Sequence, residues 1–135
     1  MTLKLLGMPT IKFSVPTLPV PFMRTGFQEK RRYNYARYTN YKNLVGLVAR
    51  RAMNGRAPLT GAIKVVAEFF KHKPQPRKGS KPQVTFQGDV DNFLKAVLDA
   101  MNGICYEDDR QVIFVQATKI FGEPHITVEV EEITQ

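Results

Sequence analysis

The clearest periodicity in the chain lies near its C-terminus, where the stretch HITVEVEEI alternates apolar and polar residues. Ile126, Val128 and Val130 fall on one face of an extended chain and polar residues fall on the other, which is the pattern of a half-buried strand. Three more stretches, rich in Val, Ile and Phe, predict strands over residues 11–15, 62–70 and 111–120.

Two other stretches repeat apolar residues at the spacing of an amphipathic helix. The first is predicted to begin after a cap at Asn40 and to end at Gly55. Its apolar positions are Leu44, Leu47, Val48 and Ala52. The second is predicted over residues 91–101 and ends at Asn102-Gly103. Its apolar positions are Phe93, Leu94, Val97, Leu98 and Met101.

The connecting stretches are rich in Pro, Tyr and basic residues. Residues 24–39, RTGFQEKRRYNYARYT, show little apolar periodicity and are interpreted as a surface loop. Residues 71–83, KHKPQPRKGSKPQ, hold five Lys and Arg, three Pro and no acidic residue, which predicts a mobile basic loop. The order β-α-β-α-β-β predicts a single small α/β domain over residues 1–135, with a mixed sheet and two main helices.

Charge is unevenly distributed along the chain, which carries a formal net charge of +8. Residues 1–88 hold 17 Lys and Arg against 2 Asp and Glu, whereas residues 89–135 hold 3 basic and 10 acidic residues. A basic body attracts polyanions, of which nucleic acid is the commonest, although a plain basic surface is the alternative.

Several classes of protein are disfavoured by the composition. No apolar run approaches the ~20 residues of a membrane span, and the N-terminus lacks the apolar core of a signal peptide, so we expect a cytoplasmic protein. A single cysteine excludes an internal disulfide and a cysteine-built zinc site. Cys105 is expected to be a small buried hydrophobe.

Acidic residues crowd into residues 88–111, around the single Lys95. Asp89 and Asp91 begin the second predicted helix, and Asp108-Asp109 precede the next strand. If that strand lies beside the helix start, up to four carboxylates converge, and a divalent cation would relieve their repulsion. The alternative is structural: a helix cap, an ordinary ion pair from Asp91 to Lys95, and an acidic turn.

These residues also resemble a known signature. The stretches DVDNFLKAVLDAMNG and YEDDRQV match, without a gap from Asp89 to Val112, the signature of RusA-type Holliday junction resolvases. Those proteins are small, dimeric, Mg²⁺-dependent endonucleases common in phages and prophages. The match includes D-x-D-N, a lysine four residues after the second Asp, the helix end D-A-x-N-G and the turn D-D-x-Q.

The resemblance implies a role for each matching residue. Asp89, Asp91 and Asp109 would be the catalytic, metal-binding carboxylates, Lys95 the catalytic lysine, and Asp108 a further metal-binding residue. The cofactor would be Mg²⁺, with Mn²⁺ as a substitute and no organic cofactor. The partners would be a four-way DNA junction and a second copy of the chain, without a membrane.

Basic residues are expected to bind DNA phosphates. They are Arg24, Lys30, Arg31, Arg32, Arg37, Arg77, Lys78, Lys81 and Lys119. Tyrosines lie among the first five and would either stack on an exposed base or pack the loop. The chain departs from the family where a basic residue and Pro often precede the first Asp, since Gln87 and Gly88 stand there. We expect the 71–81 loop to replace the lost contact.

The predicted activity is hydrolysis of opposing strands of a four-way junction, in recombination and repair. Two alternatives remain open: a non-catalytic, basic nucleic-acid-binding protein, and a Mg²⁺-dependent nuclease that acts on other branched DNA. A pure binder would gain affinity by losing its acids, which argues against the first alternative.

Overall fold

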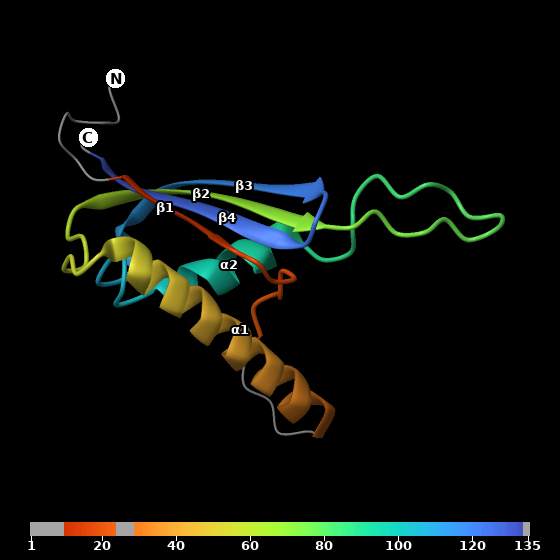
Figure 1. Ribbon diagram of the computed structural model, residues 1–135, viewed down its shortest axis with the longest axis horizontal. Coiled ribbons are helices and arrows are strands. Elements are labelled where there is room, and N and C mark those ends of the chain that lie inside the picture. The colour runs from red at the N-terminus through yellow and green to blue at the C-terminus, as the bar shows by residue number, and fades with distance from the viewer. Residues whose placement is uncertain (1–9, 24–28, 134–135) are drawn as a thin grey trace.

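The computed structural model describes residues 10–23 and 29–133, and of residues 29–32 it describes the backbone only. Both helices cover the same face of a four-stranded sheet, and the described elements leave the other face uncovered (Figure 1). In chain order the elements are β1 (Thr10–Val15), α1 (Glu29–Met53), β2 (Ala62–Lys71), α2 (Val90–Met101), the short 3₁₀ helix η1 (Asp109–Gln111), β3 (Val112–Phe121) and β4 (His125–Ile133).

The sheet is mixed, as the sequence predicts. Its strand order is β1-β4-β2-β3, with β2 and β3 parallel and β4 antiparallel to both of its neighbours. The order β-α-β-α-β-β is confirmed, and the predicted ends of all four strands lie within one residue of the observed ones. Because β2 and β3 are parallel, the chain must return from the end of β2 to the end of the sheet where β2 begins. Helix α2 makes that return along one face of the sheet.

The first helix corrects the sequence-based prediction. Residues 29–39, which were expected to form a loop, are the first three turns of α1, and Asn40 lies inside the helix as an exposed residue rather than at its cap. No Gly or Pro interrupts residues 29–45, so nothing breaks the helix there. The loop prediction is wrong because Tyr38, which is only 2% exposed, anchors this otherwise basic segment in the core.

The buried stripe of α1 also differs from the predicted one. Leu44 and Leu47 remain 38% and 49% exposed on the outer face of the helix. The stripe that packs inward repeats every three or four residues and consists of Tyr38, Tyr41, Val45, Ala49 and Met53. The Tyr38 ring lies edge-on to Phe22, at 5.7 Å between ring centroids, so Tyr38 packs in the core, whereas Tyr33 is 75% exposed.

The core lies between the sheet and the two helices. Alternate residues of β2 are fully buried on the helix-facing side, namely Ile63, Val65, Ala67 and Phe69. In β4 the predicted alternation is confirmed, since Ile126, Val128 and Val130 are buried. Cys105 is also fully buried, as expected, and burial raises the pKa of its thiol to about 12, which keeps it protonated and unreactive.

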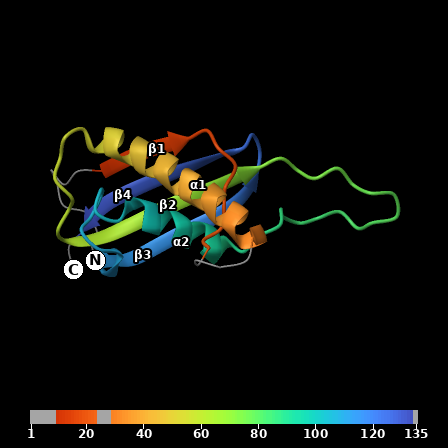
Figure 2. The same cartoon turned by 90° about the horizontal axis from the view of Figure 1, so that it is seen from below.

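Helix α2 lies beneath β2 and β3 and runs antiparallel to them (Figure 2). Phe93, Val97 and Met101 face the sheet and are buried. The Phe93 ring packs against Phe69 and Phe86, with ring centroids 5.5 and 5.9 Å apart. This packing fixes the position of both ends of α2, and Asp89 and Asp91 lie at its start.

Residues 72–83, here called the basic arm, project beyond the end of the sheet (Figure 1). All of them are exposed, and Pro residues at 74, 76 and 82 favour an extended backbone. The tip is a tight turn in which the Ser80 N–H donates to the Arg77 carbonyl at 3.0 Å and Gly79 has φ +83°. In the described part of the chain, no helix has the length and apolar character needed to cross a membrane.

Candidate active site and nucleic-acid interface

The start of α2 presents two exposed carboxylates. Asp89 occupies the N-cap position with extended backbone angles, yet its side chain makes no capping hydrogen bond. Asp91 lies in the first turn, and its Oδ1 accepts only the neighbouring Asn92 N–H at 3.0 Å among the hydrogen bonds of the described residues. The capping alternative for Asp89 is therefore not realised, and both carboxylates are open to solvent.

Two segments hold the start of α2 and the residues just before it in place. The Phe22 N–H, in the Pro-rich stretch after β1, donates to the Asn92 carbonyl at 3.0 Å. The Lys119 ammonium, on β3, donates to the carbonyls of Phe86 and Gly88 at 2.5 and 2.6 Å. The backbone around Asp89 is therefore tied to segments far away in sequence.

Lys95 lies one turn after Asp91 and is exposed. Its ammonium is 4.8 Å from the centroid of the Phe22 ring, a cation–π distance. Asp99, a further turn along, is engaged differently: its Oδ2 accepts the Tyr38 hydroxyl at 2.8 Å and lies 3.4 Å from the Lys42 ammonium. Asp99 therefore joins α2 to α1 and has a structural role.

The acidic turn before β3 is built around a cap. Asp108 accepts the Arg110 N–H at 2.9 Å, and this hydrogen bond is the main cause that lowers the pKa of the Asp108 carboxyl. The Gln111 side chain accepts the N–H groups of Glu107 and Asp108, both at 2.9 Å, and donates to the carbonyls of Leu59 and Gly61. Gln111 thus fastens the turn to the start of β2, a role that its place in the motif alone did not reveal.

The two acidic pairs lie at opposite ends of α2. Asp109 follows Tyr106 by three residues, and the Tyr106 hydroxyl donates to the Leu98 carbonyl near the end of the helix at 2.7 Å. A helix of 12 residues is about 18 Å long. The condition for convergence is therefore not met within one chain, and the described residues contain no group of three or more His, Cys, Asp or Glu placed to hold a metal ion.

The basic residues predicted to bind DNA fall into three sets. Arg77, Lys78 and Lys81 are exposed on the basic arm, and Arg37 is exposed on α1. Lys30, Arg31 and Arg32 belong to the first turns of α1, but their side chains and the whole of Arg24 lie outside the described residues. Lys119 is engaged with backbone carbonyls rather than free at the surface.

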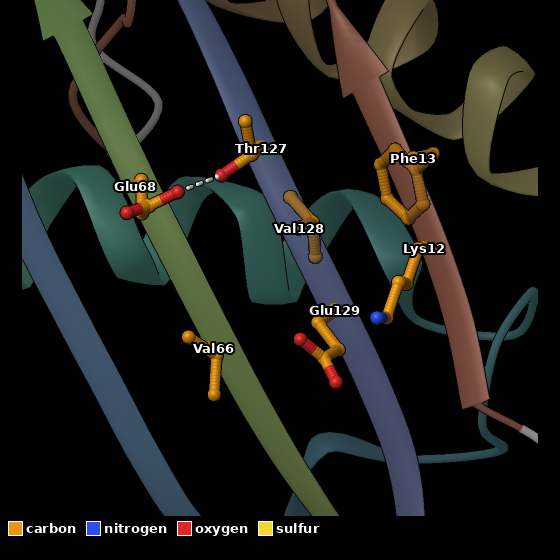
Figure 3. Close-up of a pocket in the computed structure, with 7 residues that line it drawn as sticks. All are labelled: Lys12, Phe13, Val66, Glu68, Thr127, Val128 and Glu129. Carbon is orange, nitrogen blue, oxygen red and sulfur yellow. Dashed lines mark hydrogen bonds between the residues drawn. The ribbon is translucent and has the colours of Figure 1, made fainter.

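A shallow hollow lies on the open face of the sheet, between β1, β4 and β2 (Figure 3). Its polar side chains belong to cross-strand neighbours: Glu68 accepts the Thr127 hydroxyl at 2.8 Å, and Lys12 is opposite Glu129 in the register. The acidic pairs are at the ends of α2 on the other side of the sheet, so this hollow is not part of their site.

Comparison with known proteins places this chain in a family. The family model described as Endodeoxyribonuclease RusA matches residues 16–131. The chain belongs to the RusA endodeoxyribonuclease family. Membership implies endodeoxyribonuclease activity, and the resemblance read from residues 89–112 is confirmed.

One curated relative matches over nearly its whole length. The protein described as "Uncharacterized protein YqaN", from Bacillus subtilis (strain 168), is 28% identical over 144 residues, which cover 94% of this chain and 99% of the relative. The description of that relative adds no substrate, so the RusA family match carries the functional assignment.

Gly88 provides a test of how tightly the start of α2 is packed. It has φ +110°, and a Cβ added there would lie 2.5 Å from Cζ of Phe93. Gly79 has φ +83°, but a Cβ added to Gly79 would have no other atom within 4 Å. Replacing Gly79 with Ala should cost about 1 kcal/mol of backbone strain. Gly88→Ala should cost a further ~1–3 kcal/mol because it overpacks the Phe93 ring.

Urea denaturation of the two variants measures this difference. Equal losses of unfolding free energy for Gly88→Ala and Gly79→Ala would show that the contact with Phe93 does not constrain the start of α2.

Proposed function

We propose that the protein is a metal-dependent endonuclease that resolves four-way DNA junctions by paired, symmetric hydrolysis of two phosphodiester bonds. The observation that carries the proposal is the exposed pair Asp89 and Asp91 at a helix start, on a chain whose first 88 residues are strongly basic. Membership of the RusA family supports the nuclease chemistry.

The start of α2 suits a hard divalent cation. Mg²⁺ binds through one or two carboxylates, keeps several waters and takes further oxygens from substrate phosphate. Asp89 and Asp91 are exposed and have oxygen atoms without protein partners among the described residues, which fits that donor set. Mg²⁺, or Mn²⁺ in its place, would supply Lewis-acid stabilisation of the phosphate and activation of a water.

The protein's own residues would orient the DNA. Lys95 is exposed one turn from Asp91, where its ammonium can neutralise negative charge on the phosphate under attack. The basic arm and Arg37 offer further cations, and phosphate contacts of this kind position a duplex without reading its sequence. The arm projects beyond the end of the sheet that holds the start of α2 (Figure 1), so it is placed to contact DNA next to the scissile bond.

A homodimer would bring the separated acids together. Strand β3 is one of the two edge strands of the described sheet, and three consecutive apolar residues, Ile113, Phe114 and Val115, are 40–50% exposed on it. An exposed, apolar edge strand is a template for pairing with another strand. Antiparallel pairing of β3 with β3 of a second copy would obey two-fold symmetry and extend the sheet across both copies.

The register of that pairing follows from the apolar patch. If Phe114 lies on the two-fold axis, Ile113 of one copy is opposite Val115 of the other, and Val112, the first residue of β3, is opposite Gln116. Asp109 precedes Val112 by three residues, in η1, on the side where the partner's β3 continues toward Lys119. Asp109 would then be near the partner's Lys119, which holds the backbone just before the partner's Asp89. Each active site would take Asp89, Asp91 and Lys95 from one copy and Asp109, with Asp108 next to it, from the other.

Two symmetric sites suit the substrate. A four-way junction has near two-fold symmetry, and two related active sites would cut opposing strands at equivalent positions. A non-catalytic, nucleic-acid-binding protein and a nuclease for other branched DNA are the two competing functions. The free carboxylates at the start of α2 disfavour the first, since they would repel DNA without a cation.

Replacing Asp91 with Asn tests the nuclease assignment. Cleavage of a labelled four-way junction in Mg²⁺ should fall about 100-fold or more, because the interactions removed are worth several kcal/mol in the transition state. Junction binding should persist. The control Glu129→Gln removes a carboxylate on the open face of the sheet, which the helices do not cover, and should cleave like the wild type.

The alternatives give different results in the same assay. If Asp91→Asn cuts at nearly the wild-type rate, the assignment is wrong. If the wild type binds the junction without cutting it in any divalent metal, and Asp91→Asn only binds more tightly, the protein is a binder. Equal cleavage of a linear duplex of the same sequence would point to a nuclease with another substrate.

Replacing Phe114 with Glu tests the proposed dimer surface. Two like charges would face each other on the axis, so dimerisation should weaken by at least about tenfold. Leu47→Glu places the same charge on an exposed apolar residue of α1 and should leave the dimer intact. Sedimentation velocity over a range of concentrations measures both; a Phe114→Glu protein that dimerises as tightly as the wild type would exclude β3 as the interface.

A further inference from the structure

The segment between the basic arm and α2 has little regular structure, although it must place Asp89. Residues 84–89 belong to no strand or helix, and Val84 is 95% exposed. The segment is nevertheless ordered from Phe86 onward, where the Phe86 ring is buried against Phe93 and Phe121. Contacts from another element therefore supply the order that backbone pairing does not.

Lys119 provides the polar part of those contacts. Lys119 of β3 pairs with Phe69 of β2 in the parallel register, so both side chains are on the same face of the sheet. The Phe69 side chain is fully buried on the helix-facing side. From there the Lys119 ammonium reaches the carbonyls of Phe86 and Gly88, at 2.5 and 2.6 Å, and lies 4.8 Å from the centroid of the Phe86 ring. Two of its three N–H donors are thus directed to backbone oxygens of one short segment.

These hydrogen bonds are of the stronger kind. A cationic donor shortens and strengthens a hydrogen bond, and the effect grows where nearby side chains exclude water. The bonds join the end of β3 to the residue immediately before Asp89. Since the Asp89 side chain has no capping bond of its own, its direction depends on the backbone that Lys119 holds.

We infer that Lys119 is a positioning residue: its ammonium fixes the 86–88 backbone and so orients the Asp89 carboxylate at the active site. This inference rests on the proposed function for its effect on cleavage. It differs from the phosphate contact expected of Lys119 from the sequence, because the donors that would bind DNA are engaged within the protein.

The two roles predict different salt dependences. Each lost phosphate contact reduces the slope of log affinity against log salt by about 1. Lys119→Met keeps the length of the side chain and removes the donors, and it should leave junction affinity within about twofold and the slope unchanged. Lys78→Met, on the exposed basic arm, is the matched control and should reduce the slope by about 1.

A second measurement needs neither metal nor cleavage. In metal-free protein, amide hydrogen exchange over residues 86–92 should accelerate at least about tenfold in Lys119→Met and stay unchanged in Lys78→Met. Lys119→Gln retains an amide donor and should restore part of the protection. Unchanged protection of residues 86–92 in Lys119→Met would overturn the inference. So would a reduction of about 1 in the slope of log affinity against log salt for the same variant.

Cleavage then links position to chemistry. Junction cleavage by Lys119→Met should fall about 10–100-fold at saturating DNA, with partial rescue by Lys119→Gln, as for residues that orient a ligand without touching the substrate. If the wild type cleaves the junction and Lys119→Met cleaves it just as fast, the positioning role is refuted. If the wild type itself does not cleave junctions, the proposed function fails, while hydrogen exchange still decides whether Lys119 holds the segment.

Discussion

The packing of α2 beneath β2 and β3 is the constraint on which the rest of the structure depends. Phe93, Val97 and Met101 bury one face of the helix against the sheet, so the helix can neither slide nor turn without exposing that face. Its direction is fixed by the parallel pairing of β2 and β3, which α2 must connect. The acids near its two ends are consequently separated by the helix, which is about 18 Å long.

That separation links three features that are otherwise unrelated. The acidic pairs are too far apart to act on one phosphate, the edge strand β3 exposes three apolar residues, and the substrate proposed from the family has two-fold symmetry. The proposed dimer through β3 would account for all three, because antiparallel pairing exchanges the two ends of the strand. In that arrangement the basic arms of the two copies would extend from opposite ends of one continuous sheet.

The sequence was most informative where a single periodicity determined the environment of each residue. The alternation in residues 125–133 and the apolar face of α2 were identified because burial follows period 2 or 3.6 directly. The first turns of α1 could not be predicted because Tyr38, in a stretch rich in Arg and Lys, looks like a loop residue in sequence but is buried in the structure.

The roles of side chains that bond to distant backbone groups could not be predicted from the sequence either. The motif identified Asp89, Asp91 and Asp109 as acids of interest, but their distances depend on strand order, which a motif does not contain. Lys119 and Gln111 make their contacts with carbonyls and N–H groups far away in the chain, and no pattern of side chains records such partners.

The most direct test of a site shared between two copies is to mix two inactive variants, Asp91→Asn and Asp109→Asn. After subunit exchange about half of the dimers are mixed, and in each of these one active site carries both substitutions while the other carries none. The account predicts that the mixture regains junction nicking, with one strand cut per dimer, although neither variant cuts alone. A mixture as inactive as its components would contradict it.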